Sequence, residues 1–168
     1  MLRASFFLDR QRFCTLTVGD IRVDAFSGNG THRNNPDSVA VRSEGPLPLG
    51  IYYIVDRKSG GFFGKVKSWY LGRDEWFALY RDDGQIDDET FVRSVNRGLF
   101  RLHPLGPSGR SEGCVTVQRQ EDFDNIRRAL LNHGKQEVGN TGLDAYGTLA
   151  VGRVLDAVHP DPSGAAVA

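Results

Sequence analysis

The sequence predicts a mainly β fold, a β-rich α+β architecture with one or two helices packed on a sheet. Short segments in which apolar and polar residues alternate recur along the chain, and glycine, proline, asparagine or aspartate separates them. Only two stretches carry apolar residues at helical spacing. Of the 168 residues, 39% are hydrophobic and 25% charged, enough for one buried core. We therefore predict a single domain over residues 1–155 and a flexible C-terminal tail over residues 156–168.

The N-terminal strands are expected at residues 5–8, 13–18 and 21–26, arranged as a meander. A Gly-Asp pair at residues 19–20 forms the tighter of the two turns between them. In the second strand Cys14, Leu16 and Val18 share one face, which predicts that the Cys14 thiol lies in the core. The polar run at residues 27–37 is expected to be a surface loop.

Three further strands are expected at residues 51–56, 76–81 and 146–154. Prolines in the connector at residues 45–50 fix their own φ and keep the chain extended as it enters the first of these strands. The aromatic residues between the first two of them are assigned to the core: Phe62, Phe63, Trp69 and Tyr70.

One short helix is expected within residues 82–98, where Phe91 and Val95 are four apart, Asp87 or Asp88 is the N-cap and a glycine ends the segment. The clearest helical pattern covers residues 122–133. It has an apolar stripe, acidic residues in its first turn and a glycine after its last residue. Its stripe is made by Phe123, Ile126, Leu130 and Leu131.

The best candidate active site lies in the segment LFRLHPLGPSGRSEGCVTVQ, residues 99–118. In its first strand Phe100 and Leu102 point to one face, so His103 points to the other. A loop rich in glycine and proline turns the chain back. In the second strand Val115 and Val117 share the buried face, which leaves Cys114 on the opposite face with His103. The loop can bring the thiol and the imidazole together.

A thiol attacks a carbonyl carbon as the thiolate, and an imidazole in hydrogen-bond reach can take its proton. We therefore predict Cys114 as nucleophile and His103 as base. Gly113 leaves room for a substrate carbonyl, and the N–H groups of Gly113 and Cys114 can form an oxyanion hole. Ser111 can fix the loop by hydrogen bonding. The alternative is that an isolated cysteine and histidine are ordinary packing residues.

The order of His103, two glycines and the run Ser111-Glu112-Gly113-Cys114 resembles the active-site signature of the L,D-transpeptidase catalytic-domain family. In two places the chain departs from that signature. Glu112 stands where the signature has histidine, and Thr116 replaces a basic or amide residue. With these departures the chain resembles most closely the branch of type VI secretion effectors that attack peptidoglycan. Three upstream motifs follow in the order of that branch, at residues 26–30, 34–36 and 45–52.

The resemblance implies an L,D-transpeptidase-like β-sandwich or barrel and a cysteine acyltransferase acting on peptidoglycan tetrapeptide stems. The implied reaction is L,D-carboxypeptidase trimming, L,D-transpeptidase exchange of a D-amino acid, or both. The catalytic positions are Cys114, His103, Ser111 and Gly113. The substrate-binding positions are Arg101, Arg110, Glu112, Ser27, Gly28 and Asn29. As an antibacterial toxin, such a protein is expected to have a cognate immunity protein and a secretion apparatus component as partners.

The composition of the chain argues against several other classes of function. The chain has 21 Lys plus Arg and 21 Asp plus Glu, so no excess positive charge favours binding to nucleic acid. Its two cysteines have no metal-ligand spacing, and we predict neither a metal nor a cofactor. No signal peptide and no membrane span is recognised, so we expect synthesis in the cytoplasm and delivery by another machine to the periplasm of target bacteria.

Other functions remain open from the sequence. A carboxylate at Glu112 raises the pKa of a neighbouring thiol, which favours a catalytically weak or inactive peptidoglycan-binding module. Arg101, Arg110 or a protonated His103 can offset that effect. A resident cell-wall cross-linking enzyme, or a resident cytoplasmic cysteine peptidase, is the other alternative.

Overall fold

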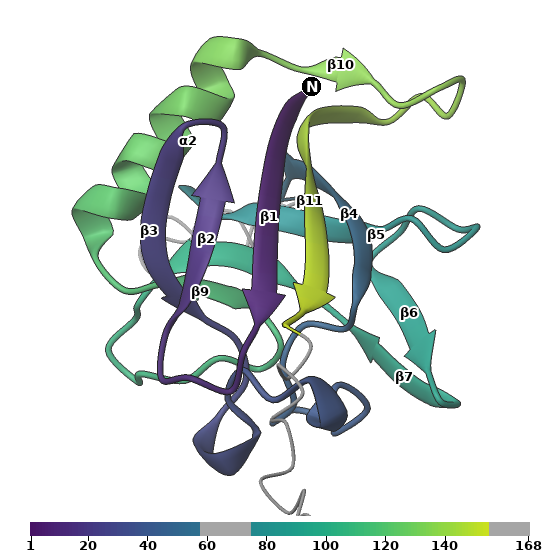
Figure 1. Ribbon diagram of the computed structural model, residues 1–168. Helices are drawn as coiled ribbons and strands as arrows, with labels where there is room; N and C mark the ends of the chain where they lie inside the picture. Colours follow the sequence, from purple (N-terminus) through teal and green to yellow (C-terminus); the bar gives the residue numbers. More distant parts are fainter. Residues whose placement is uncertain (58–74, 155–168) are drawn as a thin grey trace, which may run out of the picture.

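Strands wrap into a closed barrel in the computed structural model, which describes residues 1–57 and 75–154 (Figure 1). The strand order is β1-β2-β3-β9-β8-β5-β4-β11-β10, and β1 also pairs with β11, which closes the sheet. The strands are β1 (Leu2–Leu8), β2 (Cys14–Val18), β3 (Ile21–Phe26), β4 (Gly50–Asp56), β5 (Phe77–Arg81), β6 (Glu89–Val92), β7 (Val95–Gly98), β8 (Arg101–Pro104), β9 (Val115–Val117), β10 (Gln136–Glu137) and β11 (Asp144–Arg153). The predicted mainly β class is confirmed.

The N-terminal meander is confirmed. β1, β2 and β3 pair antiparallel in sequence order, and Gly19 takes a φ of +57° in the turn between β2 and β3. Alternate residues such as Phe6 and Leu16 are buried in the barrel core. Cys14 is buried with them, as predicted, and its Sγ donates a hydrogen bond to Asp9 Oδ1 at 2.9 Å. The first cysteine is therefore part of the core.

Closure of the barrel depends on the parallel pair β1–β11, which runs from Leu2 beside Gly147 to Leu8 beside Arg153. Gly147 has to be a glycine, because a Cβ there would lie 2.4 Å from the carbonyl oxygen of Leu2. The expected strands at 51–56, 76–81 and 146–154 are confirmed as β4, β5 and β11, with boundary shifts of one or two residues.

The helix α2 (Gln120–His133) confirms the clearest helical prediction. Phe123, Ile126 and Leu130 are buried and join the core, and the helix contacts β3, β8, β9 and β11. It ends where Gly134 adopts a φ of +78°. None of the described helices combines the length and apolarity that a bilayer crossing would demand.

The expected helix within residues 82–98 is wrong: β6 and β7 form a hairpin there, separate from the barrel sheet (Figure 1). Val92 pairs with Val95, and the two residues of the turn, Arg93 and Ser94, have φ of +49° and +67°. A left-handed two-residue turn matches the twist of a hairpin and cannot occur within a helix. Phe91, whose spacing from Val95 suggested the helix, is 66% exposed.

Two predictions fall outside the described residues. The aromatic core assignments lie within residues 58–74, and the tail at 156–168 lies within residues 155–168. Both remain predictions, as does the domain boundary at residue 155.

Candidate active site

The two strands of the candidate site, β8 and β9, are neighbours and run parallel. Leu102 pairs with Val115 and both point into the core, as the alternation predicts. His103 pairs with Thr116 on the opposite face. Cys114 comes immediately before β9, so the thiol and the imidazole belong to the same face of adjacent strands, two positions apart in register.

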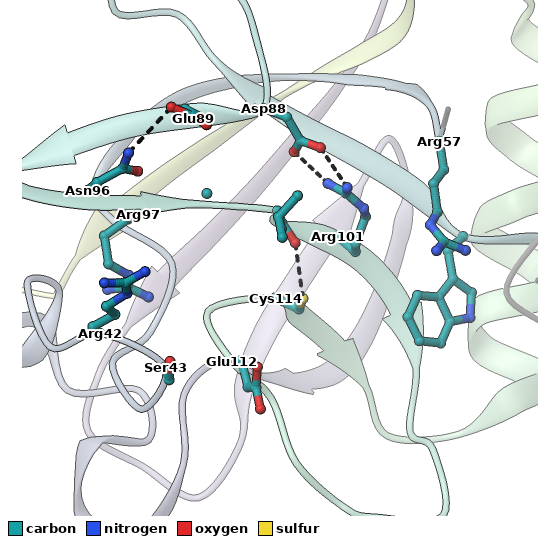
Figure 2. A pocket seen from close by; sticks show the side chains of 13 residues that line it. Arg42, Ser43, Arg57, Asp88, Glu89, Asn96, Arg97, Arg101, Glu112 and Cys114 are labelled. Carbon is teal, nitrogen blue, oxygen red and sulfur yellow. Dashed lines mark hydrogen bonds and ion pairs between the residues drawn. The ribbon is translucent and has the colours of Figure 1, made fainter. Parts of the chain in front are cut away.

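A pocket of about 640 Å³ opens beside Cys114 (Figure 2). Its wall is unusually charged for a small cavity. It contains four arginines and three acidic residues: Arg42, Arg57, Arg97, Arg101, Asp88, Glu89 and Glu112. Cys114 and Leu99 also line it. A substrate that carries both carboxylates and amines matches such a wall better than an apolar one does.

The Cys114 thiol is neutral in this arrangement. Burial raises its pKa to about 11, and the carboxylates of Glu112 and Asp88 act in the same direction. The backbone N–H and the charge of Arg101 oppose them without cancelling the effect. The Sγ atom also lies 4.0 Å from the carbonyl oxygen of Leu99. A base therefore has to remove the proton as the thiol reacts.

His103 is held in the tautomer that such a base needs. Its Nδ1 lies 2.7 Å from the carbonyl oxygen of Pro104, which can only accept, so Nδ1 carries the hydrogen. Nε2 is then the basic nitrogen, and the Thr116 hydroxyl lies 3.4 Å from it. Trp76 stacks on the imidazole with centroids 4.3 Å apart. This cover leaves His103 only 5% exposed, although it points away from the core.

Ser111 fixes the loop before the cysteine, as the sequence suggests. Its hydroxyl donates to the carbonyl oxygen of Cys114 at 2.7 Å. Its own N–H donates to Asn29 Oδ1 at 2.8 Å. Both residues are buried. Asn29, predicted to bind substrate, therefore supports the loop that precedes Cys114.

The room expected beside Gly113 for a substrate carbonyl is occupied by protein. A Cβ at this residue would lie 2.6 Å from Arg97 Nη2 and 2.9 Å from the Phe100 ring. Gly113 also has a φ of +93°, where an L side chain is strained. The glycine therefore allows Arg97 and Phe100 to pack directly behind the loop that carries Cys114.

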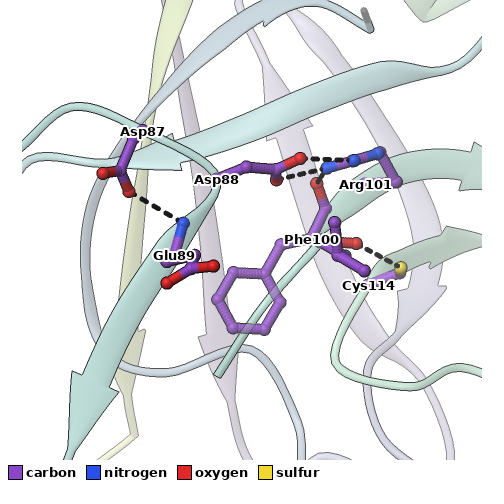
Figure 3. A network of polar contacts seen from close by, with 7 residues as sticks. Asp87, Asp88, Glu89, Phe100, Arg101 and Cys114 are labelled. Atoms are coloured by element: carbon purple, nitrogen blue, oxygen red, sulfur yellow. Dashed lines mark hydrogen bonds and ion pairs between the residues drawn. The ribbon is translucent and has the colours of Figure 1, made fainter. Parts of the chain in front are cut away.

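Arg101 is not free to bind a substrate carboxylate. Its Nη1 and Nη2 each donate to Asp88 at 2.6 Å, a bidentate pair that Figure 3 shows beside Cys114. Nη1 also donates to the carbonyl oxygen of Phe100 at 2.7 Å. The predicted binding residue therefore acts as half of a neutralised ion pair.

The remaining predicted binding residues separate into two groups. Glu112 is exposed and lines the pocket. Ser27 and Gly28 do not line it. They are buried, the Ser27 hydroxyl accepts from the Leu47 N–H at 2.7 Å, and a Cβ at Gly28 would lie 2.9 Å from backbone. Arg110 forms an exposed ion pair at 3.5 Å with Glu44, outside the pocket lining.

Among the pocket residues that sequence reasoning missed are Asp88, Arg97, Trp76 and Arg42. Asp88 and Arg97 lie in the segment wrongly predicted as a helix, so the direction of their side chains could not be predicted. Trp76 adjoins a strand whose pairing with β8 could not be foreseen from periodicity. No sequence pattern around Arg42 indicates a functional role.

The polar loop predicted at residues 27–37 contains two 3₁₀ turns, Gly30–His32 and Pro36–Ser38.

No group of three or more potential metal ligands occurs in the described parts of the chain. A search of curated proteins and a search of solved structures each returned no match. A family model, the Tlde1 domain, matches residues 21–141. That range includes β3 to β9, α2 and every candidate site residue. Because the match spans well over half of the chain, the protein belongs to the Tlde1 domain family, a family of type VI secretion effectors.

Proposed function

We propose that the protein is a cysteine-dependent acyltransferase that acts on peptidoglycan tetrapeptide stems, as an L,D-carboxypeptidase, an L,D-transpeptidase that exchanges the terminal D-amino acid, or both. The observation that carries this proposal is the placement of Cys114 at a charged pocket, on the same sheet face as a histidine whose Nε2 is left basic. Membership of an effector family that is compatible with a peptidoglycan target supports it.

In the first half-reaction, His103 Nε2 takes the proton from Cys114 Sγ as sulfur attacks the carbonyl carbon between the third and fourth stem residues. A tetrahedral oxyanion forms, and the N–H groups of Gly113 and Cys114 are the donors proposed for it. The C–N bond then breaks. The imidazolium returns its proton to the leaving amine, so that D-alanine departs and a thioester remains on Cys114.

The second half-reaction depends on the acceptor. Water gives a shortened tripeptide stem, and a free D-amino acid gives an exchanged tetrapeptide. In each case His103 takes a proton from the acceptor and returns it to sulfur as the thioester breaks. Ser111 acts here as a positioning residue, because its hydroxyl holds the carbonyl oxygen of Cys114.

The neutral thiol favours one alternative, a peptidoglycan-binding module without chemistry. Glu112 and Asp88 both raise the pKa of Cys114, which slows spontaneous thiolate formation. One experiment distinguishes acyl transfer from binding without chemistry. Purified protein is incubated with muropeptides, and the products are resolved by mass spectrometry. Acyl transfer predicts tripeptide or exchanged tetrapeptide from wild type and none from Cys114→Ala, whereas unchanged muropeptides from both proteins would favour the binding module.

Membership of a type VI secretion effector family supports a proposal for the biological setting. We propose delivery by a secretion apparatus to the periplasm of a rival bacterium, and an immunity protein that covers the Cys114 pocket. Expression with an added export signal should then be toxic, and Cys114→Ala should remove the toxicity at equal abundance. Equal toxicity of wild type without export would contradict a periplasmic target.

A further inference from the structure

Among the charged or titratable side chains near Cys114, four line its pocket, Arg101, Asp88, Glu112 and Arg97, and a fifth, His103, lies on the neighbouring strand. Three of them are already accounted for. Arg101 and Asp88 neutralise each other through two hydrogen bonds of 2.6 Å. His103 carries a hydrogen on Nδ1 and is the proposed base through Nε2. Of these five side chains, Glu112 with its negative charge and Arg97 with its positive charge remain.

Arg97 is a buried cation without a carboxylate partner in the described structure. It is 4% exposed, and its acceptors are all backbone carbonyls, those of Val39, Gly45 and Pro46. The distances to Gly45 and Pro46 are 3.0 and 3.3 Å. Carbonyl oxygens satisfy N–H groups without cancelling the charge. Among residues 1–57 and 75–154, the positive charge of Arg97 is therefore not compensated by a carboxylate.

The sequence around Arg97 is built to keep the guanidinium in place. A Cβ on Gly113 would lie 2.6 Å from Nη2, and a Cβ on Gly45 would lie 3.2 Å from Nη1. The Phe100 ring lies 5.5 Å below the guanidinium carbon and covers one of its faces. Arg97 thus joins the 39–46 loop to the back of the Cys114 loop.

We propose that Arg97 is a positioning residue whose positive charge stabilises the Cys114 thiolate and the oxyanion that follows it. This proposal deepens the acyl-transfer function and rests on it for the oxyanion, but the thiolate part stands independently. Arg97 lines the same pocket as Cys114 (Figure 2). A Cβ on Gly113, the residue before Cys114, would meet Arg97 Nη2, so Arg97 lies directly behind the Cys114 loop. The electrostatic interaction between Arg97 and Cys114 also acts to raise the pKa of the arginine, against the dominant effect of burial.

The test measures the reactivity of the Cys114 thiol in the absence of substrate. Alkylation of Cys114 by iodoacetamide, a neutral reagent, is followed at pH 8 by mass spectrometry of the Cys114 peptide. Loss of a nearby positive charge raises a thiol pKa by about one unit, which lowers the thiolate fraction about tenfold. A more basic thiolate is also a better nucleophile, and this raises the alkylation rate about threefold. Alkylation is therefore expected to slow about threefold.

Three variants separate charge from shape. Arg97→Gln and Arg97→Met remove the charge, and Arg97→Lys keeps it while losing the guanidinium fork. Arg33→Gln is the matched control, because Arg33 also covers a phenylalanine, with its guanidinium carbon 4.0 Å from the Phe26 centroid, but does not line the pocket. Thermal melts verify that each variant is folded before alkylation.

The proposal predicts slower alkylation in either folded neutral variant and rates within about twofold of wild type in Arg97→Lys and Arg33→Gln. Equal slowing in Arg97→Lys, or no slowing in the neutral variants, would overturn it. Failure of both neutral variants to fold would assign Arg97 to the scaffold alone and would also overturn it. Because the assay contains no peptidoglycan, these outcomes are independent of whether the protein cleaves a stem peptide.

Discussion

At the scale of residues, the two cysteines have different environments on one chain. Cys14 is buried in the core and bonded to Asp9, and its pKa is raised strongly, by burial first and by the Asp9 hydrogen bond second. Cys114 is partly exposed and faces a pocket. Limited alkylation of the native protein should therefore label Cys114 first. Peptide mapping that found Cys14 labelled faster would contradict the assignment of the two faces.

His103 is the residue on which proton transfer depends. His103→Ala should lower turnover by about a hundredfold or more, the usual contribution of a general base. Because the ring is stacked on Trp76, some stability is lost as well, on the order of 1 kcal/mol. Thr116→Val is the matched control, since it removes only the hydroxyl 3.4 Å from Nε2. Turnover of the two variants on purified muropeptides, corrected for folded protein, gives the comparison.

Wild-type turnover in His103→Ala would mean that another group deprotonates the thiol. A loss in Thr116→Val as large as that in His103→Ala would mean that the hydroxyl, and not the imidazole alone, is essential to the proton transfer.

At the scale of elements, the β6–β7 hairpin carries the clearest backbone strain. Arg93 and Ser94 both adopt positive φ, which costs most side chains energy that asparagine largely avoids and glycine avoids. The double substitution Arg93→Asn with Ser94→Gly supplies the Asn-Gly pair that such a turn favours, and it should stabilise the protein by about 1 kcal/mol. The Tm should rise accordingly. Arg93→Gln with Ser94→Ala is the control, because it removes the same charge but does not supply the Asn-Gly pair. It should give no gain; a gain there would point to surface charge as the cause.

The same hairpin shows where prediction from sequence ends. Strands β1 to β5, β11 and helix α2 follow from periodicity, turn residues and a terminal glycine, all of which are local signals. The 82–98 segment failed because Phe91 and Val95 imitate helical spacing, whereas its true determinant is a turn of two residues that rarely favour positive φ. The roles of Asp88 and Arg97 depend on that hairpin, so they could not be predicted either.

The candidate site divides in the same way. The common face of Cys114 and His103 and the bonding role of Ser111 follow from alternation and loop chemistry. The burial of Ser27 and the pairing of Arg101 with Asp88 depend on contacts far apart in sequence, which no local pattern contains.

At the scale of the whole molecule, Asp56 links two barrel strands to the segment that follows α2. It lies on β4, accepts from Tyr146 of β11 at 2.8 Å and pairs with Lys135, which follows α2. Burial alone would raise the Asp56 pKa, but the hydrogen bonds from Lys135 and Tyr146 together lower it. A lowered carboxyl pKa stabilises the folded state above the unfolded value of about 3.9, and this stability is lost as the pH falls through the folded pKa.

Asp56→Asn should therefore lower the free energy of unfolding at pH 7 and flatten its decrease between about pH 5 and pH 2. The loss should stay below about 1 kcal/mol, because the ion pair is largely exposed and solvent screens it. Urea unfolding across this pH range measures both effects. An unchanged pH profile in the variant would show that other carboxylates dominate the acid limb.

Acylation of Cys114 is measured most directly by rapid-quench intact-mass spectrometry, with wild-type protein and a disaccharide tetrapeptide mixed and stopped in acid from milliseconds to minutes. A tripeptide acyl group should appear on the protein, map to Cys114, be released by hydroxylamine as a thioester is, and decay as product accumulates. Cys114→Ala should form neither adduct nor product. Release of D-alanine with no adduct on Cys114 at any time, or release by Cys114→Ala, would contradict a cysteine acyl-enzyme.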